Sequence, residues 1–285
     1  MKHRIARLIE AQEPWAKPLG ETAQGWLATA FARTRPAKDL LNGVWLGHPL
    51  HPLLTDVPVG ALTTALLLDL AGERRAADLA VCAGVLGMAA SAASGAADAV
   101  DAYGRPQAQA TVHATVMSAS LAAYVGSLAL RAAGPASRTT AVALAMLGYG
   151  AMAAGAYVGG ELVFRSGNMV DRHAWRGGGA KWRALDVAEV PEGQPVAARL
   201  ESDRLVLVRE GEMIHALHDT CAHAGGPLHE GQLVDGCIEC PWHGSRFRIS
   251  DGRVVRGPAV YDQPRFEVRR TEAGLEARLA PQSAD

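Results

Sequence analysis

The chain has 285 residues, enough for one to three domains, and 49% of them are hydrophobic although only 5% are aromatic. Its formal net charge of −1 at pH 7 gives no basic footprint for binding nucleic acid. Of the four cysteines, Cys82 lies in an apolar segment, and no disulfide framework is indicated. The first residues do not lead into an apolar core with a cleavage site, so no signal peptide is predicted.

Residues 1–47 form a polar N-terminal segment that is punctuated by prolines. An amphipathic stretch around Trp26 to Phe31 predicts a helix that is exposed or lies on a membrane surface. No function can be assigned to this segment from its residues.

Residues 48–165 are dominated by apolar runs of 18 to 25 residues, each long enough to cross a hydrocarbon core of about 30 Å. Charged residues gather in the links between the runs, whereas a soluble helical bundle would carry them on its outer faces. Small residues recur at every fourth position of the second run (Gly87, Ser91, Gly95), which lets membrane helices approach closely. The sequence therefore predicts four transmembrane helices, at Leu53–Leu70, Leu79–Ala97, Thr111–Leu130 and Thr140–Phe164.

Basic residues predict the orientation of these spans, since an even number of spans leaves both chain ends on one side. Nine lysines and arginines lie on that side and four on the other, which favours cytoplasmic termini in a bacterial plasma membrane. The nine are Arg33, Arg35, Lys38, Arg105, Arg165, Arg172, Arg176, Lys181 and Arg183; the four are Arg74, Arg75, Arg131 and Arg138.

Histidines and acidic residues also lie in or beside the apolar runs. The segment from Gly47 to Pro52 (GHPLHP) leads into the first span, His113 opens the third, and Gly159–Arg165 (GGELVFR) closes the fourth. With Asp56, Asp69 and Glu161, these features resemble a predicted four-helix membrane family, domain of unknown function 2231. The resemblance implies a topology more than a mechanism, and some bacterial proteins similar to this one join that domain to a second domain described below.

Ionisable residues inside a membrane are costly, so they are candidates for function. His51 and His113 could be the axial ligands of a b-type haem, or His113 could handle protons or quinone together with Asp56, Asp69 or Glu161. The simpler interpretation is a structural anchor, because His48 and His51 lie among prolines at the interface and His113 lies near a helix end.

Residues 166–181 read as a flexible, basic linker that contains Gly177, Gly178 and Gly179 and suits the surface of an anionic membrane. The stretch Asp171–Trp175 is a candidate for pinning this linker to the interface.

Residues 182–280 contain short alternating runs between turn signals, which predicts a small antiparallel sandwich. The fold class is therefore multi-domain, with an N-terminal all-α four-helix transmembrane bundle and a C-terminal all-β domain. The predicted strands are Trp182–Val187, Pro195–Leu200, Arg204–Arg209, Met213–His218, Arg265–Arg270 and Leu275–Leu279.

Two pairs of metal-binding residues organise this domain. Cys221 and His223 form the first pair, and Cys240 and His243 form the second after a gap of sixteen residues. Two thiolates and two imidazoles suit a zinc ion, and they equally suit a 2Fe–2S cluster with two Cys on one iron and two His on the other. A zinc finger would place its His pair on a helix, and no helical period occurs here.

The run Cys240-Pro241-Trp242-His243-Gly244-Ser245 and the later Gly257-Pro258-Ala259 resemble a Rieske iron–sulfur domain over roughly residues 181–280. The resemblance implies a 2Fe–2S cluster with Cys221 and Cys240 on the buried iron and His223 and His243 on the outer iron. It also implies that the two ligand loops cap one end of the sandwich, where partner proteins would dock on the exposed His ligands near Pro227, Trp242 and Pro258.

Departures from the family pattern indicate which type of Rieske domain this is. Rieske proteins of cytochrome bc complexes carry an additional Cys in each loop, and here the comparable positions are Gly226 and Trp242, so the chain resembles the ferredoxin and oxygenase types. Ser245 could donate a hydrogen bond to a cluster sulfur and raise the potential. Phe247 replaces a tyrosine of the bc type and cannot donate, which predicts a potential toward the low end of roughly −150 to +300 mV.

About forty residues follow His243 and read as closing strands, which leaves no room for the second iron site of an oxygenase catalytic subunit. No Gly-rich nucleotide-binding loop occurs either. The leading function is a membrane-anchored one-electron carrier between a reductase and an unidentified acceptor, with protein partners and a lipid bilayer. The alternatives are an intramembrane redox protein with haem or quinone in the bundle, and a non-catalytic redox sensor.

Overall fold

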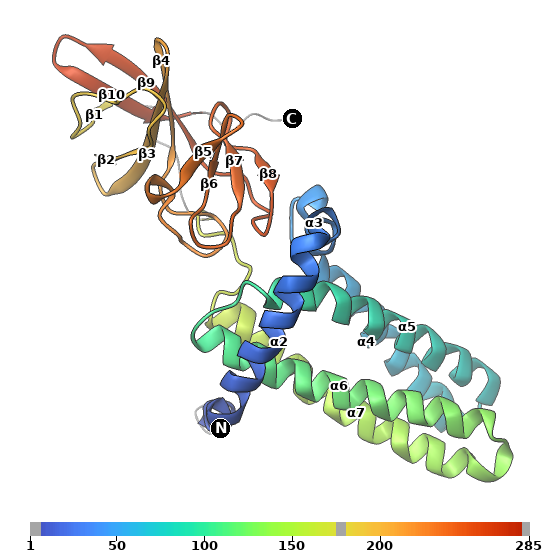
Figure 1. Cartoon of the computed structure of the whole chain (residues 1–285). Coiled ribbons are helices and arrows are strands. Elements are labelled where there is room, and N and C mark those ends of the chain that lie inside the picture. Colours follow the sequence, from blue (N-terminus) through green and yellow to red (C-terminus); the bar gives the residue numbers. More distant parts are fainter. Residues whose placement is uncertain (1–6, 175–180, 281–285) are drawn as a thin grey trace. The chain divides into compact units, whose positions relative to one another are not determined.

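The computed structural model describes residues 7–174 and 181–280. It divides into two compact units, which Figure 1 shows as a helical part and a strand-rich part. The first unit contains the residues up to 37 and 49–168, and the second contains 38–48 and the residues from 169 onward. After residues 175–180, the description of the second unit continues at Lys181.

The described part of the polar N-terminal segment, from residue 7 onward, is mostly helical. Helix α2 (Glu13–Arg33) is followed by α3 (Arg35–Asn42) and a short 3-10 turn, η1 (Val44–Leu46). Helix α2 contains the predicted amphipathic stretch and contacts α6, where Ala16 is fully buried. The amide Nε2 of Gln24 donates to the carbonyls of Ala99 (2.6 Å) and Ala102 (2.8 Å), so α2 also holds the turn that follows α5.

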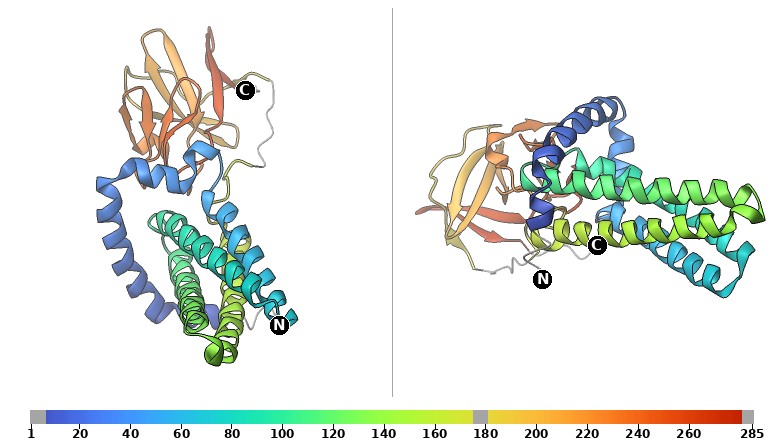
Figure 2. Two further views of the ribbon diagram at one scale, coloured as in Figure 1. Left: turned by 90° about the vertical axis from the view of Figure 1, so that its right-hand side faces the viewer. Right: turned by 90° about the horizontal axis from the view of Figure 1, so that it is seen from below.

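Four long helices follow, and in the described residues four helical segments are long and apolar enough to cross a membrane. They run side by side as two antiparallel hairpins (Figures 1 and 2), and large apolar side chains such as Leu67, Leu86 and Leu147 face outward. An outer surface of this kind suits the apolar interior of a membrane, in line with the long apolar runs of the sequence. The helices are α4 (Leu50–Ala71), α5 (Arg74–Ala99), α6 (Arg105–Ala132) and α7 (Arg138–Gly160), which continues in a π turn (Glu161–Arg165) after a short 3-10 turn (Pro135–Ser137).

Glycines allow the two helices of each hairpin to approach closely. A Cβ atom on Gly84 of α5 would lie 2.3 Å from the Leu62 side chain of α4, and one on Gly148 of α7 would lie 3.1 Å from the Tyr124 ring of α6. Both contacts lie near the middle of their hairpin, so the two hairpins repeat the same packing. Substitution of either glycine would force the larger side chain aside.

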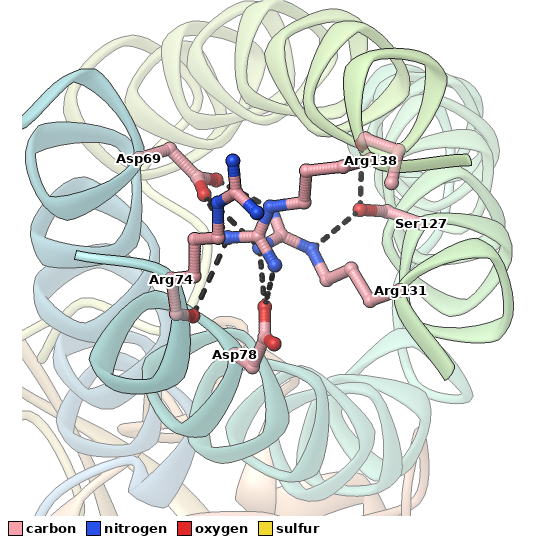
Figure 3. Close-up of polar contacts among 7 residues, drawn as sticks. Asp69, Arg74, Asp78, Ser127, Arg131 and Arg138 are labelled. Atoms are coloured by element: carbon pink, nitrogen blue, oxygen red, sulfur yellow. Dashed lines mark hydrogen bonds and ion pairs between the residues drawn. The ribbon is translucent and has the colours of Figure 1, made fainter. Parts of the chain in front are cut away.

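An ion-pair cluster, buried at Asp69 and Arg131, joins the two hairpins where their turns lie (Figure 3). Arg131 and Arg138 each contact both Asp69 and Asp78, with nitrogen–oxygen distances of 2.6 Å from Arg131 to Asp78 and from Arg138 to Asp69. The Asp69 and Arg131 side chains are only 3% and 2% exposed. Ser127 Oγ accepts a further hydrogen bond from Arg131 at 3.1 Å. Two carboxylates and two guanidiniums neutralise one another, which offsets the cost of burying the charges of Asp69 and Arg131.

We expect Arg131→Leu to lower the free energy of unfolding by about 3–5 kcal/mol, because Asp69 would stay buried with only one guanidinium partner. Thermal unfolding of the detergent-purified protein would measure the effect. Arg105→Leu is the matched control, since Arg105 pairs with Glu10 at the surface and such pairs contribute at most about 1 kcal/mol. Equal losses in the two variants would contradict a structural role for the buried cluster.

The second unit contains two antiparallel sheets, as the alternating pattern predicted (Figure 1). One has six strands in the order β1-β10-β9-β4-β3-β2, and the other has four in the order β5-β6-β7-β8. The first sheet contains β1 (Arg183–Ala184), β2 (Val196–Leu200), β3 (Asp203–Glu210), β4 (Met213–His218), β9 (Arg265–Thr271) and β10 (Gly274–Leu279). The second contains β5 (Gln232–Val234), β6 (Cys237–Glu239), β7 (Arg246–Arg248) and β8 (Val254–Arg256).

Two apolar clusters form the core of this unit. One lies on the larger sheet around Leu205, Leu207 and Phe266. The other contains Ile238 and Phe247 of the smaller sheet and extends to Cys221 and Cys240. The segments that carry the four candidate ligands are therefore anchored in a closed core, between β4 and β5 and between β6 and β7.

Candidate metal centre

The two ligand loops have the same backbone construction. In the first, the Cys221 N–H donates to the Gly226 carbonyl (2.9 Å) and the Gly225 N–H donates back to the Cys221 carbonyl (2.9 Å). In the second, Cys240 and Gly244 repeat both bonds, with Ser245 in place of Gly226. Gly225 and Gly244 have φ values of +89° and +71°, a conformation that glycine adopts without steric cost. Two matching turns therefore present one Cys and one His each.

The two cysteines are buried and lie close together. Their side chains are 1% and 3% exposed, and the Cys221 thiol donates a hydrogen bond to the Cys240 sulfur, which lowers the pKa of Cys240 to about 7 and raises that of Cys221. The backbone N–H groups two and three residues further along each loop point at the sulfurs. Hydrogen bonds of this kind stabilise thiolate, the form that binds a metal.

The two histidines form the other side of the centre. Their ring centroids are 5.1 Å apart and the ring planes are nearly perpendicular. Burial, with smaller effects from His243, Lys38 and Arg172, lowers the pKa of His223 to about 3, so its imidazole is neutral and keeps a lone pair. Only His243 is partly exposed, whereas His223 is 8% exposed, so the expectation that both rings are accessible was wrong.

The ring separation discriminates between coordination geometries. Two nitrogens at about 2 Å from one metal, with roughly 1.1 Å from each nitrogen to its ring centre, place the ring centres about 5 Å apart at a tetrahedral angle and about 6 Å apart when they lie opposite one another. The observed 5.1 Å fits two imidazoles on one tetrahedral iron. The His pair thus has the spacing of one iron's ligands.

The donor set fits a two-iron cluster better than a single zinc ion. Among the described residues, no three His, Cys, Asp or Glu side chains gather around one point as a zinc site requires. The thiols therefore form one pair and the imidazoles another, which is the arrangement for two metals bridged by inorganic sulfide. Cys221 and Cys240 would hold the inner iron, and His223 and His243 the outer iron.

Gln263 holds the first loop, although no motif in the sequence marks it as part of the site. Its amide donates to the carbonyls of His218 and Thr220, both at 2.6 Å, and its oxygen accepts from the Ala222 N–H at 3.0 Å. His173 adds a hydrogen bond from Nε2 to the same Thr220 carbonyl at 2.7 Å. His173 is therefore buried in the second unit. It belongs to the stretch Asp171–Trp175 that was proposed to pin the linker to the interface, and Trp175 of that stretch lies outside the described residues.

Charged residues hold the second loop. Arg256 donates to the Gly244 carbonyl from Nε (2.8 Å) and Nη2 (2.5 Å), and Glu239 pairs with Arg256 and Arg246 at 2.8 and 2.6 Å. The Ser245 hydroxyl oxygen accepts the Ala259 N–H at 3.0 Å in a fully buried position. In the sequence these residues resemble ordinary surface charges, and only the pairing of β6, β7 and β8 brings them together.

The positions that carry a disulfide in the bc type lie in contact here. A Cβ atom on Gly226 would lie 3.0 Å from the Trp242 ring, so the indole packs against the backbone of the first loop. Packing therefore holds the two loops together in this chain. Trp242 is still 49% exposed and Pro227 is partly exposed, whereas Pro258 is buried and offers no docking surface.

The candidate residues of the bundle differ in their contacts and exposure. His51 and His113 come together, with ring centroids 6.2 Å apart. Asp69 forms ion pairs within the cluster described above, and Glu161 pairs with Arg165 at 3.1 Å. Asp56 lies exposed on the outer face of α4. The structure therefore brings together only the two histidines of that set.

Two families match the chain. Residues 181–267 match the family described as "Rieske [2Fe-2S] domain", and residues 47–172 match "Predicted membrane protein (DUF2231)". Both matches agree with the resemblances found in the sequence.

Among curated proteins, the ferredoxin component of the naphthalene 1,2-dioxygenase system of Pseudomonas aeruginosa is 33% identical over 91 residues, which cover 31% of this chain and 86% of that protein. The ferredoxin subunit of anthranilate 1,2-dioxygenase of Burkholderia cepacia is 29% identical over 101 residues, 35% of this chain and 94% of the relative. Mouse apoptosis-inducing factor 3 is 32% identical over 97 residues, but the chain spans only 16% of its length.

A solved structure, the ferredoxin of carbazole 1,9a-dioxygenase from Nocardioides aromaticivorans IC177, is 29% identical with a TM-score of 0.29 and covers 32% of this chain and 88% of its own. The residues that match the Rieske family model include both ligand loops. The match to the membrane family ends before the first described strand begins. The chain thus belongs to the Rieske [2Fe–2S] domain family through its C-terminal part, which follows the residues that match the predicted membrane protein family.

Proposed function

We propose that the protein is a membrane-anchored one-electron carrier that passes electrons from a reductase to an acceptor protein. The observation that carries this proposal is the centre itself, two matched loops with buried thiols on one side and a partly exposed imidazole on the other. A 2Fe–2S cluster bound there supplies a one-electron couple.

Each part of the centre has a distinct task in this role. The N–H groups of the loops stabilise negative charge on the two sulfurs. Gln263 and Arg256 fix the loop carbonyls, so the ligands move little when the charge changes. Trp242 and the edge of His243 form the accessible part of the site, and we assign partner docking to them.

The relatives support the proposed partners. Two of them are named as ferredoxin components of dioxygenase systems, which implies a reductase as donor and an oxygenase as acceptor for those proteins. We propose the same classes of partner here, with the bundle confining the carrier to a lipid bilayer. An oxygenase catalytic subunit is not proposed for this chain.

Reduction of the purified full-length protein tests the carrier function. A reductase of a dioxygenase system, supplied with reduced nicotinamide, is expected to place one electron per chain on the centre, seen by electron paramagnetic resonance. Addition of an oxidised acceptor should then remove that electron within the same sample. A redox sensor, by contrast, would show no turnover with these proteins and would change its partner binding when the centre is lost.

The second candidate function is an intramembrane redox protein, in which the bundle takes part in electron transfer. One observation favours it, the convergence of His51 and His113 inside the bundle.

Ser245→Ala is expected to lower the reduction potential of the centre by several tens of mV, because hydrogen bonds to cluster sulfur favour the reduced, more negative state. The hydroxyl oxygen already accepts the Ala259 N–H, so its own proton remains to be donated. Spectroscopic redox titration measures the shift. Ser250→Ala, at an exposed serine of the same unit, is the control, and an unchanged potential in Ser245→Ala would contradict the proposed bond.

Impermeant maleimide labelling tests the proposed cytoplasmic orientation. In a background with Cys82 and Cys237 replaced by serine, Ser250→Cys should be labelled in inverted vesicles and protected in spheroplasts. Ala136→Cys, in the exposed turn between α6 and α7, should show the reverse pattern because one helix separates it from the C-terminal side. Labelling of Ser250→Cys in intact spheroplasts would overturn the orientation that the basic residues predict.

A further inference from the structure

The two hairpins of the bundle each carry a histidine in the same structural position. His51 lies at the start of α4 and contacts Gly95 near the end of α5, and His113 of α6 contacts Gly159 near the end of α7. A Cβ atom on Gly95 would lie 2.9 Å from the His51 ring, and one on Gly159 would lie 3.2 Å from the His113 ring. Both glycines are therefore needed for the imidazoles to fit against the neighbouring helix.

Both rings are held through the same nitrogen. His51 Nδ1 hydrogen-bonds to the Ser91 carbonyl at 2.8 Å, and His113 Nδ1 hydrogen-bonds to the Gly155 carbonyl at the same distance. A carbonyl can only accept, so each ring carries its proton on Nδ1 and leaves the lone pair on Nε2. Metal-binding histidines are oriented in this way by a backbone carbonyl on the other nitrogen.

The separation of the rings indicates how they would bind a metal. Their centroids are 6.2 Å apart and their planes are nearly perpendicular. By the geometry applied to His223 and His243, this value matches about 6 Å for two imidazoles on opposite sides of one metal, and exceeds the value of about 5 Å for a tetrahedral angle. The ring separation of His51 and His113 thus fits axial ligands of one metal, whereas that of His223 and His243 fits tetrahedral ligands.

We propose that His51 and His113 are the axial ligands of a haem iron, bound through Nε2 within the helical bundle. Two opposite ligands leave an octahedral metal with four equatorial positions, and in the described part of the chain no third His, Cys, Asp or Glu joins the pair. A planar tetrapyrrole supplies four nitrogens in that plane and suits an apolar bundle. A haem held there would supply a one-electron couple, which dithionite reduces in the test below. This site is independent of the carrier function assigned to the Rieske centre.

The test uses full-length protein purified in detergent from cells supplied with iron and δ-aminolevulinic acid. The dithionite-reduced minus oxidised spectrum is expected to show a sharp haem band, with one haem per chain by the pyridine haemochrome assay. His51→Ala and His113→Ala should each lower the bound haem at least ten-fold and keep the electron paramagnetic resonance signal of the Rieske centre. His48→Ala, three residues from His51, is the matched control and should keep both.

Two further variants separate ligation from folding. Imidazole in the buffer should restore haem to His113→Gly, which a purely structural histidine would not allow. His113→Met should retain haem with a shifted spectrum, because a thioether also ligates haem iron. Wild-type protein with a full Rieske signal and no haem would overturn the proposal and leave the carrier function standing, as would haem that stays bound, with an unshifted spectrum, in all the variants of both residues.

Discussion

Cys221→Ser is expected to abolish the iron–sulfur centre, with iron and acid-labile sulfide falling at least ten-fold per chain. A thiolate is the metal ligand, and a serine hydroxyl at the same position keeps its proton at neutral pH. Cys221 also lies in the buried core cluster at 1% exposure, where neither water nor another side chain can replace a lost ligand. Metal analysis and electron paramagnetic resonance of the purified variant measure the loss directly.

Cys237→Ser is the matched control for this result. Cys237 is three residues from Cys240 and is also buried, but it lies on β6, where its thiol points to the Asp235 carbonyl at 3.7 Å. Burial raises the pKa of the Cys237 thiol, so it stays protonated at neutral pH. This variant should keep the full iron content. Loss of iron from Cys237→Ser, or its retention in Cys221→Ser, would contradict the assignment of ligands.

The four spans were predictable because long apolar runs require a long apolar environment, but their ends were not. Arg74, Arg105, Arg131 and Arg138 lie outside the predicted spans, whereas the observed α5, α6 and α7 include them. The ion-pair cluster explains three of these errors, because Asp69 and Asp78 approach Arg131 and Arg138, and the Arg74 carbonyl accepts a hydrogen bond from Arg138. A charged residue at the end of an apolar run therefore does not mark the end of the helix when a neighbouring helix supplies an ion-pair partner.

The strands show a similar contrast. Those of the six-stranded sheet were predicted, since most of them span five to eight residues and alternate or run apolar between turn signals. The four strands around the ligand loops have three residues each, too few to show a period of two. These short strands carry the second loop and were missed.

The motif that marks the four candidate ligands could be read from the sequence, and the residues that hold their loops could not. Cys and His at fixed spacing are rare, so the motif marks the site without any knowledge of the fold. Gln263 contacts the first loop from more than thirty-five residues away, and Arg256 contacts Gly244 across β7 and β8. Such roles depend on long-range contacts between common polar residues, which a single sequence does not reveal.

His243→Cys is expected to lower the reduction potential of the centre by on the order of 100 mV or more. A thiolate in place of a neutral imidazole adds a negative charge to the outer iron, which disfavours the electron that the centre accepts. Centres with four cysteines have potentials of about −400 mV, against roughly −150 to +300 mV for those with two His and two Cys. One substitution should move the potential part of the way.

His215→Cys is the control for this change, because His215 lies on β4 and pairs with Glu210 at 3.4 Å, outside the ligand loops. It introduces the same thiol and should leave the potential unchanged. Redox titration followed by electron paramagnetic resonance compares the two variants, and the His243→Cys signal should also approach that of a four-cysteine centre. The Rieske resemblance implies that the partly exposed His243 is a ligand of the outer iron, and its ring lies at a tetrahedral spacing from that of His223. Equal potentials in the two variants would show that His243 is not an iron ligand.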